Sequence, residues 1–290
     1  VGEAPAADVN LNWIVEKMVG RRPESLFTRD EHAAKEELLR VENMVLPRAG
    51  GGYVVDHVSF TLRGGEILGI YGLMGAGRTE LLESLMGLNT DAHGKIWLSG
   101  GSLDNKDIRA RIALGLSLIP EDRQLKGLIQ KLSVGHNITL ASLQRYLSRF
   151  FLSNKKERDS IKQEISDLRI KVANPDNLVT SLSGGNQQKV VVGKSLLTSP
   201  KVLMMDEPTR GIDVAAKGEI FEIMNQLALR GLGVVFVSSE LKEVLAMADR
   251  VLVMAKGRIT AEFQRSEITQ EALVAASVAM PDVAQKGVSV

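Results

Sequence analysis

The stretch GLMGAGRTE, residues 72–80, contains residue types that can hold a phosphate group. It follows the pattern G-x-x-x-x-G-K-[ST], in which glycines let the main chain wrap a phosphate and the following helix N-terminus attracts its charge. Gly72 and Gly77 are the patterned glycines, and Thr79 is the hydroxyl residue suited to a Mg²⁺ shell. Arg78 replaces the lysine with a planar guanidinium. The stretch therefore predicts nucleotide binding and leaves turnover open.

A pair of carboxylates ends a second stretch, KVLMMDEPT, residues 201–209. Apolar residues run directly into Asp206 and Glu207, which is typical of a buried strand with charged side chains at its end. Such a pair is costly to bury without a task. Asp206 is suited to holding Mg²⁺ through water, and Glu207 to polarising the water that attacks a terminal phosphate.

A third stretch, SLSGGNQQKV, residues 181–190, places Ser183, Gly184 and Gly185 at an expected helix start. A hydroxyl and backbone N–H groups there suit a γ-phosphate. Each stretch alone has an ordinary explanation: a tight turn with an exposed arginine, an acidic turn after a strand, or a helix cap. Their occurrence in one chain favours phosphate chemistry.

The elements that must position these residues follow from the apolar pattern. GEILGIY predicts a strand and RTELLESLMG a helix, so strand, glycine loop and helix occur in the required order. Further buried strands are predicted in LGLSLIP, KVLMMDE, GVVFVSSE and RVLVMAKG, which indicates an α/β core. LLRVENMVL, VVDHVSFTLRGGE and GKIWLSG alternate and predict an antiparallel sheet. Helices are predicted from about Lys155 to Lys171 and in AAKGEIFEIMNQLALRG, ending near Gly231.

Composition excludes several classes of protein. With 44% hydrophobic and 24% charged residues, the chain is expected to fold into a globular domain. A net charge of +1 gives no overall attraction to nucleic acid, and the absence of cysteine excludes disulfides and thiolate metal sites. No apolar run is long enough to cross a bilayer. The start at Val1 and the polar, charged first forty residues, with a possible helix in LNWIVEKMVG, suggest a tail and linker from a longer protein.

SLSGGNQQKV resembles L-S-G-G-Q, the signature motif of ABC-type ATPases, and the phosphate loop and LMMDE flank it in that family's order. The resemblance covers about residues 38–265. It implies an α/β fold: a P-loop ABC ATPase core with a mostly parallel sheet, an antiparallel β subdomain and a helical subdomain. It also implies ATP and Mg²⁺ as cofactors and a head-to-tail dimer in which each signature covers the ATP held by the other domain.

The resemblance assigns roles residue by residue. The ATP-binding residues it implies are Gly72, Gly75, Ala76, Gly77, Arg78, Thr79, Glu80, Ser183, Gly184, Gly185, Gln187 and Asp213. Thr79 and Asp206 are the implied Mg²⁺ ligands. The implied catalytic residues are Glu207, Ser239 and Glu121.

Several positions depart from the family pattern. Glu121 stands where the family has a glutamine, and Ser239 stands where it has a switch histidine. Together with Arg78, these changes weaken positive charge or proton handling around a γ-phosphate. The adenine-stacking aromatic would fall near Ala49, and Tyr53 is the nearest candidate but is out of register. We expect a site that holds nucleotide and Mg²⁺ but hydrolyses slowly.

GLMGAGRTEL, IPEDR, LSGGNQQKV, DEPTRGIDV and SSEL together look like the C-terminal ATPase half of the tandem ATP-binding subunits of bacterial monosaccharide importers, of the ribose, galactose, xylose and arabinose type. The resemblance implies as partners a preceding ATPase domain, transmembrane permease subunits and, indirectly, a periplasmic or extracellular sugar-binding protein. It implies a peripheral position on the cytoplasmic face of the bacterial inner membrane. We expect residues 1–37 to be a linker and tail, 38–265 the nucleotide-binding domain with a helical subdomain at about 122–182, and 266–290 a C-terminal helical tail.

Other functions remain open at this point. A soluble ABC ATPase of repair or translation is disfavoured by the neutral charge balance. A non-hydrolytic regulatory or dimerisation domain is favoured by the three departures and opposed by Glu207, and a nucleoside importer shares the tandem plan. RYLSRFFLSNKKER combines basic and aromatic residues, but a solvated helical face is preferred over nucleic-acid binding. Metal-ligand spacing is absent among the histidines His32, His57, His93 and His136.

Overall fold

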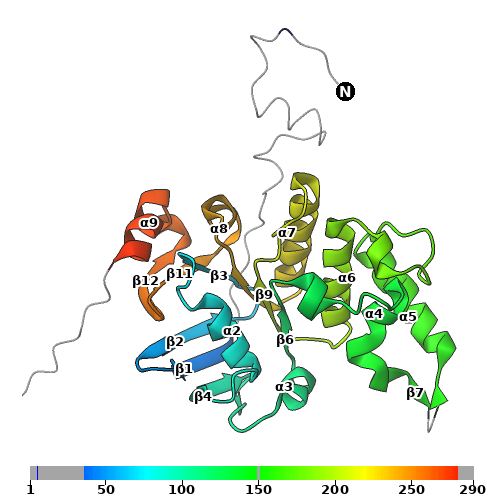
Figure 1. Ribbon diagram of the computed structural model, residues 1–290, viewed down its shortest axis with the longest axis horizontal. Coiled ribbons are helices and arrows are strands. Elements are labelled where there is room, and N and C mark those ends of the chain that lie inside the picture. Colours follow the sequence, from blue (N-terminus) through cyan, green and yellow to red (C-terminus); the bar gives the residue numbers. More distant parts are fainter. Residues whose placement is uncertain (1–4, 6–35, 149–150, 280–290) are drawn as a thin grey trace, which may run out of the picture.

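Two large β-sheets, a small hairpin and a lateral group of helices make up the described part of the structure, a computed structural model in which residue 5 and residues 36–148 and 151–279 are described (Figure 1). The helix considered in LNWIVEKMVG lies outside the described residues. Among the described residues, no helix is both long and apolar enough to span a membrane.

The larger sheet has six strands in the order β12-β11-β3-β10-β9-β6. Its members are β3 (Ile67–Gly72), β6 (Leu116–Ile119), β9 (Val202–Asp206), β10 (Gly233–Val237), β11 (Arg250–Ala255) and β12 (Arg258–Gln264). All pairings are parallel except the one between β11 and β12. Every residue of β3, β9 and β10 is buried, which explains their continuous apolar runs. The predicted mostly parallel sheet is confirmed; the edge strand β12, with no fully buried residue, was not predicted from the sequence.

The smaller sheet is antiparallel, in the order β2-β1-β4-β5, as the alternating stretches predicted. It consists of β1 (Glu37–Pro47), β2 (Tyr53–Arg63), β4 (His93–Leu98) and β5 (Gly101–Ser102). Leu39 pairs with Leu62 on one side and Leu98 on the other, and all three side chains are buried. The apolar face of this sheet is therefore turned toward the interior.

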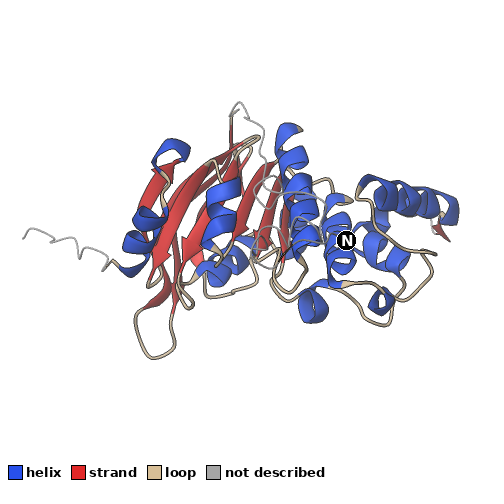
Figure 2. Cartoon of the chain, turned by 90° about the horizontal axis from the view of Figure 1, so that it is seen from above, coloured by secondary structure: helices blue, strands red, loops and turns tan. Residues whose placement is uncertain are grey.

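Helices fill the space between the sheets and cover the far face of the larger one (Figures 1 and 2). The helix between the sheets is α2 (Arg78–Met86), whose Leu81, Leu82 and Leu85 are fully buried. The far face is covered by α7 (Val214–Leu229), α8 (Leu241–Met247) and α9 (Gln270–Val278). Side chains of β3 alternate between the two resulting cores, as strand geometry requires.

Three of the remaining helices form a group beyond strand β6, and the fourth, α3 (Ile108–Leu114), lies below β6 next to the smaller sheet (Figure 1). Helix α3 precedes β6, and α4 (Val134–Thr139), α5 (Asn154–Asp167) and α6 (Gly184–Leu196) follow it. The chain between these helices contains a π-helical turn (Arg123–Gly127), 3-10 turns (Leu140–Tyr146 and Val179–Ser181) and a small hairpin of β7 (Leu147–Ser148) and β8 (Phe151–Leu152). A further 3-10 turn (Arg265–Glu267) joins β12 to α9. The helix predicted to reach Lys171 ends at Asp167, because Arg169 has a φ of +50°, a conformation that interrupts a helix.

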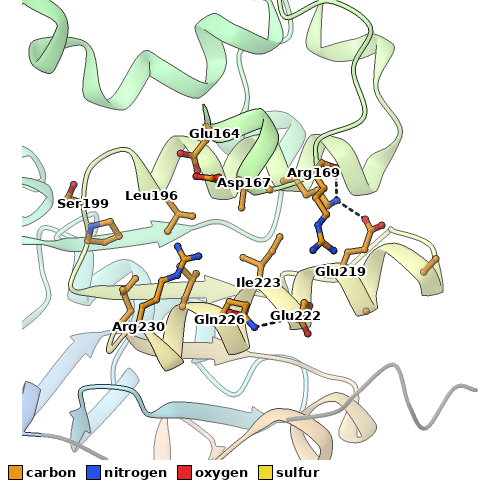
Figure 3. Close-up of a pocket in the computed structure, with 17 residues that line it drawn as sticks. Glu164, Asp167, Arg169, Leu196, Ser199, Glu219, Glu222, Ile223, Gln226 and Arg230 are labelled. Carbon is orange, nitrogen blue, oxygen red and sulfur yellow. Dashed lines mark hydrogen bonds and ion pairs between the residues drawn. The ribbon is translucent and has the colours of Figure 1, made fainter. Parts of the chain in front are cut away.

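A groove of about 1050 Å³ lies between α5 and α6 on one side and α7 on the other (Figure 3). An ion pair between Lys189 of α6 and Glu219 of α7, 2.7 Å long, crosses the space between these helices. On the α5 wall, Glu164 is only 8% exposed. Burial raises the pKa of Glu164 from its ordinary value of 4.5 to about 7; the Asp167 carboxylate adds to this rise, and Arg230 opposes it.

We expect Glu164→Gln to flatten the dependence of stability on pH. Between its unfolded and folded pKa values, Glu164 binds more protons in the folded state, so stability falls as pH rises from about 4.5 to 7. A pKa shift of this size contributes at most roughly 3 kcal/mol to the free energy of unfolding at low pH, and this contribution is lost as the pH rises through about 7. Urea unfolding of the unchanged chain and of Glu164→Gln at pH 5 and pH 8 measures this difference in the free energy of unfolding.

The matched control is Glu222→Gln, which alters an exposed carboxylate on the opposite wall of the groove. Its free energy of unfolding should depend on pH in the same way as that of the unchanged chain. An identical loss of stability from pH 5 to pH 8 in the chain with and without Glu164 would show that this carboxyl does not titrate there.

Candidate functional site

The parallel strands bring the chemically interesting stretches to one edge of the larger sheet. Gly72 ends β3, Asp206 ends β9, and Ser238 follows directly after β10, which lies between them. Val237 pairs with both Ile70 of β3 and Asp206 of β9, so the three strand ends stand side by side. Ligands of open parallel sheets bind at this carboxyl edge.

The phosphate loop has the predicted order of strand, glycine turn and helix. Gly77 precedes the first residue of α2 with a φ of +93°, and a Cβ there would lie 2.4 Å from the Val54 carbonyl oxygen. A Cβ on Gly72 would come equally close to the Met254 carbonyl, whereas Gly75 needs glycine only for its φ of +80°. The glycines are therefore required by backbone packing as well as by the turn. Ala76 is buried, and Glu80 lies in the first turn of α2.

Asp206 and Thr79 face each other across the sheet edge. Asp206 is 3% exposed, and its Oδ1 has no hydrogen-bond partner among the described residues. Burial raises the pKa of Asp206 to about 6; hydrogen bonding from Thr79 lowers it, and the Glu207 charge raises it further. A buried carboxylate oxygen beside a hydroxyl has the donor chemistry that Mg²⁺ prefers.

Glu207 is the most constrained residue of the site. Its φ of +45° is rare for a residue with a side chain. Arg78 Nη2 lies 3.5 Å from its Oε1, with both side chains 11% exposed, and Ser239 Oγ donates to its Oε2 over 3.2 Å. Arg78 Nη1 is buried without a partner among the described residues. The carboxylate is thus held from two sides by residues that differ from the family pattern.

Ser183 immediately precedes helix α6 and is exposed. Its hydroxyl makes no cap hydrogen bond to the helix and accepts one from Asn186 Nδ2, 2.9 Å away. A Cβ on Gly184 would lie 2.8 Å from Arg123 Nη2, and one on Gly185 would lie 2.4 Å from the Ala216 Cβ. The two glycines therefore let α6 approach the start of α7 closely.

Gln187 differs from the expected arrangement, because its side chain is buried and donates to the Val179 carbonyl. Asn186, not Gln187, occupies the fifth position of the motif, directly after the L-S-G-G stretch, and contacts Ser183. Counting positions in L-S-G-G-Q against LSGGN would have selected Asn186 from the sequence.

Asp213 and Glu121 take part in contacts within the domain. Asp213 caps α7 by accepting from Ala216 N over 2.9 Å, and Glu121 forms an ion pair with the Arg210 side chain. Arg123 donates to the carbonyls of Arg210 and Gly211 over 2.8 and 3.1 Å. The loop after β6 is therefore tied to the loop ahead of α7.

Tyr53 opens β2 beside the phosphate loop, because the neighbouring Val54 carbonyl packs against Gly77. Its ring is 41% exposed and meets the His57 ring edge-on, with centroids 5.3 Å apart. Ala49 lies in the exposed turn before it. Position in the fold thus favours Tyr53 as a base-stacking residue although its sequence register does not.

The structure brings the phosphate loop, Asp206, Glu207 and Ser239 together. Across the described ranges, no hydrogen bond or ion pair joins Ser183–Gly185 to the phosphate loop. Within the same ranges, no cluster of three or more His, Cys, Asp or Glu side chains suits a metal ion.

The chain is similar in sequence to ATP-binding proteins of sugar importers. The xylose import ATP-binding protein XylG of Pseudomonas fluorescens is 45% identical over 281 residues, which are 95% of this chain and 54% of that protein. XylG of Brucella abortus is 41% identical over 284 residues, covering 97% and 56%. The chain therefore spans about half the length of the curated relatives it matches.

Solved structures share the fold at lower identity. A dimeric post-hydrolysis ATP-binding cassette bound to ADP and phosphate has a TM-score of 0.69 at 19% identity, covering 79% of this chain and 99% of that one. A nucleotide-free ATP-binding cassette from an ABC transporter has a TM-score of 0.72 at 22% identity, covering 84% and 100%. The P-loop ABC ATPase fold expected from the sequence is thus confirmed.

The family profile described as ABC transporter matches residues 55–210, which is more than half of the chain and includes the phosphate loop, the signature and Glu207. This chain belongs to the ABC transporter family.

Proposed function

We propose that the chain is an ATP-binding and ATP-hydrolysing domain of a monosaccharide importer, and that its own nucleotide site is the slower of two. The observation that carries the second part is the contact between Arg78 and Glu207, 3.5 Å long, with Ser239 on the other carboxylate oxygen. A base that must accept a proton from water is less available when a guanidinium and a hydroxyl occupy its oxygens.

Nucleotide binding is supported by the loop and its helix. Backbone N–H groups at the start of α2 and its dipole favour a phosphate, and Arg78 brings positive charge to the same place. Tyr53 offers an exposed ring beside the loop for a base. Thr79 and the unpartnered Asp206 Oδ1 are the groups that would hold Mg²⁺, which when bound supplies neutralisation of phosphate charge.

Glu207 then acts as the group that orients and deprotonates the attacking water, and Ser239 orients Glu207. Ser239 carries a hydroxyl where an imidazole would offer a second protonation state, so it positions without handling a proton. Glu121 is engaged by Arg210 rather than directed at the site, so its contribution is to hold the loop ahead of α7.

The signature at Ser183 serves a second ATPase domain in this proposal. Its hydroxyl is exposed and makes no cap hydrogen bond to α6, and Gly184 and Gly185 lie at the same helix start. The covered length of the XylG relatives, 54% and 56%, is consistent with a tandem subunit of which this chain is the C-terminal half. Ser183 then completes the site of the preceding domain, while this phosphate loop faces that domain's signature.

The remaining partners follow from the importer assignment. They are transmembrane permease subunits and, through them, a periplasmic or extracellular sugar-binding protein, with the subunit on the cytoplasmic face of the inner membrane. Xylose is the first candidate sugar because both relatives are named for xylose import. A regulatory domain without hydrolysis is the second candidate function, favoured by the held Glu207 carboxylate.

Glu207→Gln tests the catalytic assignment. The amide keeps the side-chain shape but cannot accept the proton, so we expect nucleotide affinity to stay within about threefold and residual hydrolysis to fall by roughly 100-fold or more. Fluorescent-nucleotide titration and single-turnover hydrolysis with Mg²⁺ measure the two quantities. Glu222→Gln, on the exposed side of α7, is the control and should change neither.

Hydrolysis that survives unchanged in Glu207→Gln would overturn the base assignment. If the unsubstituted chain binds nucleotide but shows no hydrolysis in any setting, including together with a preceding domain, the regulatory function is correct instead.

The substrate proposal is tested by uptake. A bacterium lacking its own xylose importer ATPase, supplied with the full-length subunit and its permease, should regain xylose uptake and show several-fold less response to ribose or galactose. Uptake of a nucleoside with no response to any monosaccharide would assign the importer to the nucleoside class.

A further inference from the structure

Two loops bracket Glu207. The first continues from Glu207 through Thr209 toward α7, and the second follows β10 and contains Ser238 and Ser239. Glu207 N donates to the Val237 carbonyl over 3.0 Å, and Ser239 donates to the Glu207 side chain. The position of the Glu207 carboxylate therefore depends on the relative placement of both loops.

A single buried carboxylate, Glu243 of α8, connects these two loops. It is 3% exposed and accepts hydrogen bonds from both sides. Thr209 Oγ1 lies 2.8 Å from each of its oxygens, and Ser238 Oγ lies 2.7 Å from Oε2. Ser238 Oγ in turn accepts from Glu240 N over 3.0 Å, which joins the second loop to the start of α8. Buried hydrogen bonds to a carboxylate are among the stronger ones in proteins.

The charge of Glu243 is balanced by Lys217 of α7. Its Nζ lies 2.9 Å from Glu243 Oε1 and 2.5 Å from Glu240 Oε1. Burial lowers the pKa of Lys217, but hydrogen bonds and attraction to the two glutamates outweigh it, so the net shift is upward. The ammonium is therefore charged at neutral pH, and the network spans α7, α8 and both loops.

We propose that Glu243 is a positioning residue for ATP hydrolysis: it holds the two loops that bracket Glu207 in one arrangement and so sets where the Glu207 carboxylate lies. The proposal rests on the catalytic role proposed above for Glu207. Glu243 touches neither the reacting water nor the nucleotide in this account, and it acts through Thr209 and Ser238.

A role confined to stability is the alternative, because an ion pair buried under α8 also contributes to folding. The two roles differ in their effects. If Glu243 is a positioning residue, removing its contacts should lower kcat, leave nucleotide affinity unchanged and loosen only the two loops. If Glu243 serves only stability, removing its contacts should lower the unfolding temperature and leave kcat of the folded protein unchanged.

The experiment uses Thr209→Val and Glu243→Gln in the full chain. Thr209→Val keeps the branched shape and removes the hydroxyl that donates to the Glu243 carboxylate, and Lys217 keeps its partners. Glu243→Gln keeps the size and removes the charge. The matched control is Glu240→Gln, because Glu240 shares the partner Lys217 but its side chain contacts neither Thr209 nor Ser238 among the described residues.

Two readouts are needed. Hydrogen exchange should become about 10-fold faster in segments 207–211 and 238–241 of both test variants and unchanged in the control. The kcat should fall by about 10- to 100-fold in the test variants, with nucleotide Kd within about threefold, since small displacements of a catalytic group have effects of this size.

Unchanged exchange in both segments, or faster exchange with an unchanged kcat, would overturn the positioning role. A parallel loss in Glu240→Gln would assign the effect to Lys217 instead and also overturn it. If the unsubstituted chain does not hydrolyse ATP, the failure belongs to the proposed function, and the exchange measurement alone decides whether Glu243 holds the loops.

Discussion

The parallel register of β3, β10 and β9 is the constraint on which the site depends. Val237 is paired with Ile70 on one side and Asp206 on the other, so three loops leave the sheet at the same level. Different groups stand at these strand ends: the glycine turn after β3, the carboxylates of Asp206 and Glu207 at the end of β9, and the hydroxyls of Ser238 and Ser239 after β10. Because all three strands are fully buried, this register is set by two apolar cores and not by the polar residues themselves. The polar residues can therefore vary while the geometry of the site persists.

Arg78 illustrates such variation. A lysine at this position would present a compact ammonium to phosphate, whereas the guanidinium is broad enough to contact Glu207 from the phosphate loop. In the proposed function, the contact links a group that would bind phosphate to the group that would activate water. Ser239 completes this arrangement from the loop after the neighbouring strand β10. In the proposed function, a single substitution thus changes phosphate binding and water activation together, which would let one domain keep the family framework and still hydrolyse ATP more slowly than a partner domain.

Much of this arrangement could be predicted from the sequence, and the reasons are local. The strand, glycine loop and helix around Gly72–Thr79 and the apolar run into Asp206 depend on short-range patterns, and both are found as expected. The end of α5 was misplaced because the left-handed φ of Arg169 has no marker such as glycine. The edge strand β12 was missed because no residue in it is fully buried.

The contacts that could not be predicted from the sequence join residues that are far apart in the chain. Arg78 and Glu207, Arg123 and Gly211, and Thr209 and Glu243 are brought together only by the folded loops. Gln187 is a different case, because counting motif positions selects Asn186 from the sequence, and the Gln187 side chain is buried. Tyr53 is the opposite case: its sequence register does not match the family position, but the approach of the neighbouring Val54 carbonyl to Gly77 places it beside the phosphate loop.

Steady-state ATP hydrolysis by the full-length subunit carrying Ser183→Ala or Arg78→Ala tests the central claim most directly. We expect Ser183→Ala to lower turnover by at least about 10-fold more than Arg78→Ala, because Ser183 would serve the faster site of the preceding domain and Arg78 the slower one. The opposite order, with Arg78→Ala the more damaging change, would show instead that the phosphate loop of this domain carries the main hydrolytic site.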